Sequence, residues 1–497
     1  MKTRTICLSM LFSLLLISGS ALGAGRLPEE EIVEHNIPSH PLNLNFESRD
    51  WSVPSAQQYR HILNNGLRSY IAVDSTLPIV EITAYINYSS LNDPEGKEGL
   101  GTLMSRLLRL GGTEEISADS LNEFLDLMAI NFSFSQSESH ITFKGTFLSE
   151  YQDTALSIME QMFFHPAFEE ERVEREKRLI RESLRHRFVN PAPALNAAFQ
   201  KQQYTGSNAS RMTTASSIEN ISREDLKSLH DKVFKTDNIV LSVAGKIDKG
   251  KTIAKLESIF PQAEQTTSLT PFDNIEIRPE TKALIVHRPI NQAYVRMALP
   301  LFKRPHPDYY SVSLLNMILG GGGFTSRLGT KIRSDAGLTY SIHSRAESNY
   351  LYPGTLFIEF NTRKETLPLA IDLIYEEIER IIMEGVTEEE LQSAKTALLA
   401  QLPSMFRSAG DITSTYAWNE MYSRSQDHFV LYPEEINKLT VEDINNVARK
   451  YLNPDNFTYT IIADSTILNR LPESKRFDLS GIENKKFISI NEIETLP

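Results

Sequence analysis

Cysteine is almost absent from this chain of 497 residues, and long apolar runs are missing from all but its first segment. The single cysteine, Cys7, lies within the apolar run from Ile6 to Ile17. We expect that run to be removed on export, which leaves the mature chain without a thiol. This excludes a cysteine nucleophile, a cysteine metal site and structural disulfides. No later segment has 18 consecutive apolar residues, so the sequence predicts no membrane span after cleavage.

Histidine pairs of the kind that bind zinc on a helix are missing too. The chain has 11 histidines, and no two of them lie four positions apart. That spacing is the one that places two imidazoles on the same helical face. We therefore expect this chain itself to bind no zinc and no other cofactor.

The N-terminus is typical of a secretory signal peptide. Lys2 and Arg4 precede the apolar run, and small residues follow it up to Gly23, where we expect cleavage. The sequence thus predicts an exported protein, either periplasmic or secreted. Its formal net charge is −13 before cleavage, and it offers no basic patch, so no nucleic-acid partner is expected.

The chain contains an internal duplication. Segments that begin at Ile221 and at Leu439 share a capped amphipathic helix, an Asp-Asn turn and an apolar strand. The same offset aligns Glu170 with Glu388, each at the start of a long charged helix. Strands separated by blocks of helices favour an α+β fold. We expect two homologous halves, each with a mostly antiparallel sheet and helices packed on one face.

Composition and the duplication together set the expected domain limits. Threonine, serine and proline gather between the two halves, as is typical of a linker. We expect a signal peptide at 1–23, an N-terminal extension at 24–60, a first half at 61–261, a linker at 262–279, a second half at 280–465 and a C-terminal tail at 466–497.

An ordered set of motifs in the first half carries a family resemblance. Asn64–Leu67 leads into an apolar strand, and a second strand follows Pro78. The loop Pro94–Gly99 then opens an amphipathic helix that ends at Gly111–Thr113. With the duplication, this order resembles the pitrilysin/insulinase family of zinc metallopeptidases, which includes the mitochondrial processing peptidases. The resemblance extends from about residue 61 to 464 and implies two halves that face each other like a clam shell.

The first half departs from this family at its metal-binding helix. Active members carry H-x-x-E-H there, in which two imidazoles bind zinc and the glutamate activates water. The matching positions here are Thr102, Ser105 and Arg106. A hydroxyl is a poor zinc ligand, and an arginine cation repels a metal ion. The family's third ligand is a glutamate in the later charged helix, and Glu182 lies near that position, although we favour a solvated helix surface for it.

The second half keeps a different motif of the family. Arg333 should end a short helix that starts near Thr325, and Gly337 tolerates the positive φ of a chain reversal before Tyr340 begins a strand. Active members have an arginine and a tyrosine at this spacing, which reach the substrate backbone and the developing oxyanion. The resemblance therefore implies that Arg333 and Tyr340 bind substrate. The alternative is structural, since arginine suits a helix C-terminus and tyrosine suits a strand.

Two further segments are candidates for peptide contact by the same resemblance. The glycine run at 320–323 follows a helix and lacks the lysine and hydroxyl of a phosphate loop, so Gly321 and Gly322 are expected to face a peptide, not a nucleotide. An extended peptide can also add a strand to a sheet edge. Phe132 and Phe134 lie in the segment that we expect to form that edge.

The loss of one motif and the retention of the other predict a division of labour. Some members of the resembling family divide the site between subunits, one with zinc and one with the Arg-Tyr half. Our leading hypothesis is a non-zinc, substrate-binding subunit of an exported heteromeric zinc metallopeptidase that acts on peptides or unfolded segments. Zinc is then expected on a homologous partner subunit. The alternative is a catalytically silent scaffold or peptide-binding protein of the same fold.

Overall fold

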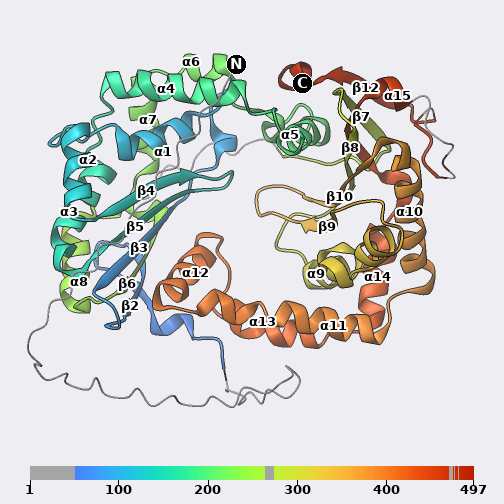
Figure 1. Ribbon diagram of the computed structural model, residues 1–497. Coiled ribbons are helices and arrows are strands. Elements are labelled where there is room, and N and C mark those ends of the chain that lie inside the picture. Colours follow the sequence, from blue (N-terminus) through green and yellow to red (C-terminus); the bar gives the residue numbers. More distant parts are fainter. Residues whose placement is uncertain (1–50, 264–273, 469–473, 475, 480, 497) are drawn as a thin grey trace, which may run out of the picture. The chain divides into compact units, whose positions relative to one another are not determined.

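The protein is described by a computed structural model that covers residues 51–263, 274–468, 474, 476–479 and 481–496 (Figure 1). The expected signal peptide, most of the N-terminal extension and the middle of the linker lie outside the described residues. Within them, no helix combines the length and the apolar character that crossing a bilayer requires.

The first half is built on a six-stranded sheet, and several of its strands alternate between buried and more exposed positions. In one central strand Val80, Ile82 and Ile86 are fully buried, whereas Glu81 is exposed. All neighbouring strands pair antiparallel except β2 and β6. In spatial order the strands are β1 (Arg60–Ile62), β2 (Arg68–Val73), β6 (Ile239–Gly245), β3 (Ile79–Ile86), β5 (Ile141–Leu148) and β4 (Asn131–Gln136).

The second half repeats the order and pairing of five of these strands, which confirms the predicted duplication, whereas its sixth strand comes from the C-terminal segment and pairs parallel. Its strand order is β12 (Asn484–Ser489), β7 (Lys282–His287), β11 (Thr458–Ala463), β8 (Gln292–Pro300), β10 (Thr355–Arg363) and β9 (Ile342–Glu347). Pairing is parallel on both sides of β7 and antiparallel elsewhere. Strand β12 falls within the expected C-terminal tail, so part of that segment belongs to the sheet.

Helices of each half pack against their own sheet, and the repeated capping motif fixes where two of them begin. Ser222 caps one helix and Thr440 its duplicate, in both cases with an aspartate three residues later completing a capping box. The helices of the first half are α1 (Leu100–Leu110), α2 (Ala118–Leu127), α3 (Gln152–Phe164), α4 (Glu170–Arg185), α6 (Ala215–Glu219), α7 (Arg223–Val233) and α8 (Lys249–Ile259). Those of the second are α9 (Tyr309–Asn316), α10 (Leu367–Glu384), α11 (Glu388–Leu399), α13 (His428–Asn437), α14 (Val441–Tyr451) and α15 (Ser465–Leu468).

One further helix from each half crosses to the other half. Helix α5 (Pro191–Gln203) packs on β11 and β8, and its duplicate α12 (Ala409–Met421) packs on β6 and β2 (Figure 1). Tyr416 of α12 shares a buried cluster with Tyr70 and Val240 of the first sheet. The sequence predicted helices on one face of each sheet, and those of the same half follow that prediction. The second face is covered by the exchanged helix.

Polar contacts fix the exchanged helix α12 on the first sheet. Arg60 forms two hydrogen bonds to Glu420, at 2.8 Å from Nε and 2.7 Å from Nη2, and the Tyr70 hydroxyl donates to the same carboxylate at 2.6 Å. Deeper in the contact, the Ser242 hydroxyl donates to Thr413 at 2.8 Å. The two halves are therefore joined by buried hydrogen bonds as well as by apolar contact.

Candidate functional site

Helix α1 carries the three positions at which the family's zinc motif is expected. Thr102 and Arg106 lie one helical turn apart and are exposed, so they share one face. Ser105 is 1% exposed, and its hydroxyl oxygen has no hydrogen-bond partner among the described residues. The residue that stands where a glutamate would activate water therefore points into the core.

An ion pair occupies the second histidine position. The Arg106 guanidinium binds the Glu176 carboxylate of α4, with Nε at 2.8 Å and Nη2 at 2.7 Å from Oε2. The Glu176 side chain is only 5% exposed, so this carboxylate is already neutralised by a cation of the chain itself. Thr102 is neutral and Glu176 is already paired with Arg106, so the side chains at this place do not fit a zinc ion. The described residues contain no group of three acidic, histidine or cysteine side chains suited to a metal.

Glu182 lies away from α1. It is exposed and pairs with Arg185 at 2.9 Å and His186 at 3.3 Å on its own helix. It lies six positions after Glu176, which turns the two side chains about 120° apart around α4. The carboxylate that reaches α1 is therefore Glu176, which the sequence reading passed over. The signal in the sequence was the spacing of Glu176, three positions after Val173 and four before Ile180, which places it on the apolar face of α4.

We expect the mature chain to bind no stoichiometric zinc. Arg106 is paired with the buried Glu176 carboxylate, and its positive charge opposes a second cation. Metal analysis after mild chelation and zinc readdition measures this directly, with an H-x-x-E-H relative treated in parallel as the positive control. About one tightly held zinc per chain, lost in Glu176→Gln, would contradict the expectation.

The loop that enters α1 is held by a buried aspartate. Asp93 accepts hydrogen bonds from the Tyr88 hydroxyl at 2.6 Å and from the backbone of Gly99 at 2.8 Å and Gly101 at 3.1 Å. Burial raises the pKa of Asp93, although these donors favour its charged form. Gly99 has φ of +101°, and a Cβ there would lie 2.7 Å from Thr213. The start of α1 is thus tightly fixed.

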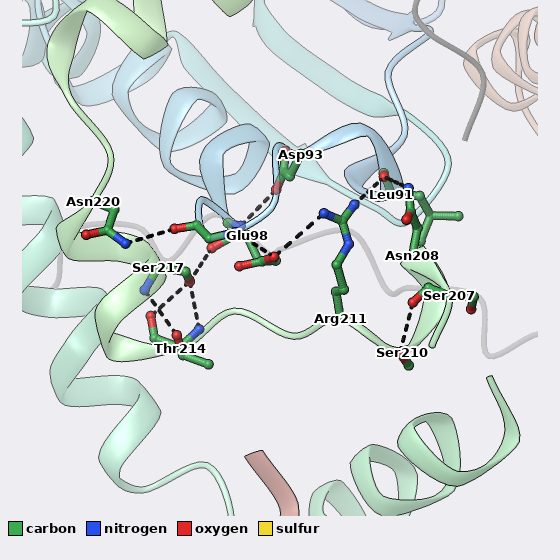
Figure 2. A network of polar contacts seen from close by, with 12 residues as sticks. Leu91, Asp93, Glu98, Ser207, Asn208, Ser210, Arg211, Thr214, Ser217 and Asn220 are labelled. Atoms are coloured by element: carbon green, nitrogen blue, oxygen red, sulfur yellow. Dashed lines mark hydrogen bonds and ion pairs between the residues drawn. The ribbon is translucent and has the colours of Figure 1, made fainter. Parts of the chain in front are cut away.

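A polar recess of about 250 Å³ opens beside Thr102. Figure 2 shows polar contacts next to it, in which Arg211 donates to the Leu91 carbonyl at 2.8 Å and Ser217 donates to the Glu98 carbonyl at 2.7 Å. Its lining also includes Glu138, whose pKa is raised by burial. The Tyr352 hydroxyl of the second half donates to Glu138 at 2.6 Å. The recess therefore lies where the β4–β5 hairpin meets the second half.

Strand β4 forms one edge of the first sheet, as the sequence predicted for this segment. The side chains of Phe132 and Phe134 do not face outward: Phe132 is 4% exposed, and both rings pack on Phe143. The exposed side chains of the strand are Asn131, Ser133 and Ser135. Any peptide contact along β4 must therefore use its backbone and these small polar groups.

Arg333 and Tyr340 lie side by side in the second half. Arg333 belongs to a π-helical turn, Gly329–Asp335, and Gly337 has φ of +61°, which reverses the chain as predicted. The Arg333 guanidinium lies 5.1 Å from the centre of the Tyr340 ring, and Tyr340 is 84% exposed. Tyr340 itself precedes β9, which begins two residues later.

Phe324 completes this cluster, and the sequence reading missed it. Its ring centre lies 3.9 Å from the Arg333 guanidinium, so Arg333 is held between two exposed aromatic rings. Such an arrangement limits the rotamers of the arginine while leaving its N–H groups available. The only signal in the sequence was the position of Phe324 directly after the glycine run.

The glycine run has a packing role. A Cβ on Gly320 would lie 2.5 Å from the backbone nitrogen of Ser344 in β9, so only glycine allows this close approach. Gly321 ends the π-helical segment Met317–Gly321 and is exposed, and Gly322 is half-buried. A Cβ on Gly321 would lie 2.5 Å from Asn316 and one on Gly322 2.8 Å from the Met317 carbonyl, and the role of both glycines in peptide binding stays a prediction.

Two family patterns match the chain and together cover more than half of it. The one described as "Insulinase (Peptidase family M16)" matches residues 70–217, and the one described as "Peptidase M16 inactive domain" matches residues 220–398. The second match contains Arg333 and Tyr340, and the first contains the positions at which zinc ligands are missing.

Individual relatives span nearly the same length. The "Uncharacterized zinc protease YmxG" of Bacillus subtilis (strain 168) is 24% identical over 80% of this chain and 96% of its own. The "Non-peptidase homolog YmxG" of Helicobacter pylori (strain ATCC 700392 / 26695) is 24% identical over 77% and 88%. A peptidase M16 inactive domain from Pseudomonas fluorescens shares the fold, with a TM-score of 0.72 at 22% identity over 84% and 99%. This chain therefore belongs to peptidase family M16, the insulinase family.

Proposed function

We propose that this chain is the non-zinc, substrate-binding subunit of an exported heteromeric zinc metallopeptidase that acts on peptides or unfolded segments. The observation that carries the proposal is the exposed Arg333–Tyr340 pair. Arg333 has no salt-bridge partner among the described residues, and it is held by Phe324 instead of by a carboxylate. A positioned arginine without a counter-charge is suited to bind an acceptor supplied from outside.

The proposed contribution of this chain is hydrogen bonding. A peptide carbonyl accepts from the Arg333 guanidinium and the Tyr340 hydroxyl, and both bonds strengthen as negative charge develops on that oxygen. The chain has no group at Thr102, Ser105 or Arg106 that activates water. The activating metal is therefore proposed to belong to a homologous subunit with an intact H-x-x-E-H motif. Export is proposed from the charged start and apolar run of the N-terminus, which lie outside the described residues.

We expect the purified mature chain alone not to cleave unstructured peptides, and to support cleavage once a zinc-bearing homologue is added. Each subunit then lacks what the other provides. Native pull-down from the envelope and secreted fractions, followed by a chelator-sensitive peptidase assay on the mixed subunits, measures both parts. The matched control is the zinc subunit alone.

The same experiment distinguishes the two hypotheses for the function, a peptidase subunit and a catalytically silent scaffold. Recovery of an H-x-x-E-H partner with activity above that of the partner alone supports the subunit proposal. Recovery of other proteins only, with no gain in cleavage on mixing, supports a catalytically silent scaffold. The Arg106–Glu176 ion pair agrees with either outcome, because both require a first half without metal.

A further inference from the structure

A second recess in the described part of the chain lies outside the proposed peptide site. It has a volume of about 680 Å³ and is formed by the end of α5 and the residues that follow it, by β7 and β12, and by the linker residues from Asn274. None of its lining residues belongs to α1, β4 or the Arg333 cluster. Elements of both halves and of the linker thus meet around one space.

Strand alternation directs two lysines into this recess. In β7, Leu284 and Val286 pack against α5, while Ile285 faces the core of the second half. Lys282 lies two positions before Leu284, so it projects on the α5 side of the sheet. Lys486 of β12 is in register with Leu284, and Ile488, two positions on, also packs on α5. Both lysines therefore extend toward the end of α5.

The floor of the recess consists of buried polar groups. Lys201, Gln203 and Lys282 are 8%, 5% and 9% exposed, and burial lowers the pKa of both lysines. Lys201 donates to the Leu496 carbonyl at 2.6 Å, which uses one of its three N–H groups. The side-chain carbonyl of Gln203 has no hydrogen-bond partner among the described residues. Buried polar groups that still have unused hydrogen-bonding capacity indicate a position for a ligand.

The charge of the recess is opposite to that of the chain. Four cations line it, Lys201, Lys282, Arg278 and Lys486, against the carboxylates of Glu276 and Glu280, of which Glu280 lies 3.6 Å from Lys282. The whole chain has a formal net charge of −13. Arg278 and Lys486 are exposed at the rim and have no salt-bridge partner among the described residues. A cationic recess in an acidic protein attracts an anion.

We propose that this recess binds a small molecule with two or more oxyanion charges. Lys201 and Lys282 contact its anionic group at the floor, Arg278 and Lys486 neutralise charge at the rim, and the Gln203 carbonyl accepts a hydrogen bond from a hydroxyl or N–H of the ligand. Phosphate esters and di- or tricarboxylates share this chemistry. The ligand would join α5 of the first half to the linker and the second sheet.

Isothermal titration of the full mature chain tests the proposal, with pyrophosphate and citrate as probes at constant ionic strength. We expect saturable binding of at least one probe with one site per chain. The double variant Arg278→Gln/Lys486→Gln changes only exposed side chains and should weaken binding about tenfold or more. Lys282→Gln should weaken it further. The matched control Lys303→Gln, an exposed lysine outside the recess, should stay within about twofold.

The pattern of results decides the outcome. Preference for pyrophosphate supports a phosphorylated ligand, and preference for citrate supports a carboxylic one. The proposal is overturned if neither probe binds saturably to the wild-type chain. It is equally overturned if the double variant binds as well as wild type, or if Lys303→Gln weakens binding as much as the rim variants do.

Discussion

Tyr340→Phe should lower kcat of the reconstituted peptidase by on the order of 10²–10³, the loss that removal of one oxyanion donor typically causes. Only a hydroxyl is removed, and Tyr340 is 84% exposed, so folding and subunit association should be unchanged. Steady-state kinetics of the assembled complex, with subunit association measured separately, provide the test. A kcat/KM within about twofold of wild type would show that the tyrosine is structural.

Arg333→Ala should lower kcat and also raise KM, because a guanidinium binds the ground-state carbonyl as well as the developing oxyanion. If Arg333 and Tyr340 serve one oxygen, the double variant should lose less than the product of the two single effects. Their contact, 5.1 Å from guanidinium to ring centre, makes such coupling expected. Fully multiplicative losses would indicate two separate sites.

The structure determines which cation serves as the control. Arg327 is near in sequence, but it binds Glu390 at 2.6 and 2.8 Å and the Gly385 carbonyl at 2.9 Å. Its removal would test stability and not substrate binding. Arg345 of β9 is exposed, and among the described residues its one salt-bridge partner is the exposed Glu347 at 3.3 Å. Arg345→Ala should therefore leave kcat/KM within about twofold.

The duplication and the capping boxes could be predicted because they are local patterns. Ser222 and Thr440 each stand three residues before an aspartate, and both helices begin as expected. The exchange of α5 and α12 could not be predicted in this way. Ala194, Ala197 and Ala198 give α5 a small, apolar surface that fits any flat sheet. Which sheet it covers depends on contacts distant in the sequence.

The candidate site was predicted in its chemistry more fully than in its geometry. The residue types at positions 102, 105 and 106 were sufficient to predict that the family's zinc ligands are missing there. They did not reveal that Arg106 forms an ion pair, because Glu176 and Glu182 differ only by their angle around α4. Phe132 and Phe134 alternate correctly for a strand, but alternation alone does not say which face is buried.

The contact between the exchanged helix and the first sheet gives the second large effect. Glu420→Ala should lower the free energy of unfolding by about 2–3 kcal/mol, since it leaves Arg60 and the buried Tyr70 hydroxyl without their shared acceptor. Glu182→Ala is the matched control. Its carboxylate is exposed and pairs on its own helix, so the change should stay below about 0.5 kcal/mol. Urea unfolding of the three proteins measures both values.

The pH dependence of this effect distinguishes the ion pair from simple loss of packing. Burial would raise the pKa of Glu420, but hydrogen bonds from Arg60 and Tyr70 and the charge of Arg60 outweigh burial and hold it below its usual value. A carboxyl with a lowered pKa in the folded state stabilises the protein above the pKa of the unfolded chain, about 4.3, and loses that contribution as pH falls through the folded-state pKa. The gap in unfolding free energy between wild type and Glu420→Gln should therefore be largest near neutral pH and shrink below about pH 4. A gap that stays constant across this range would assign the stabilisation to the shape and neutral hydrogen bonds of the Glu420 side chain and not to its charge.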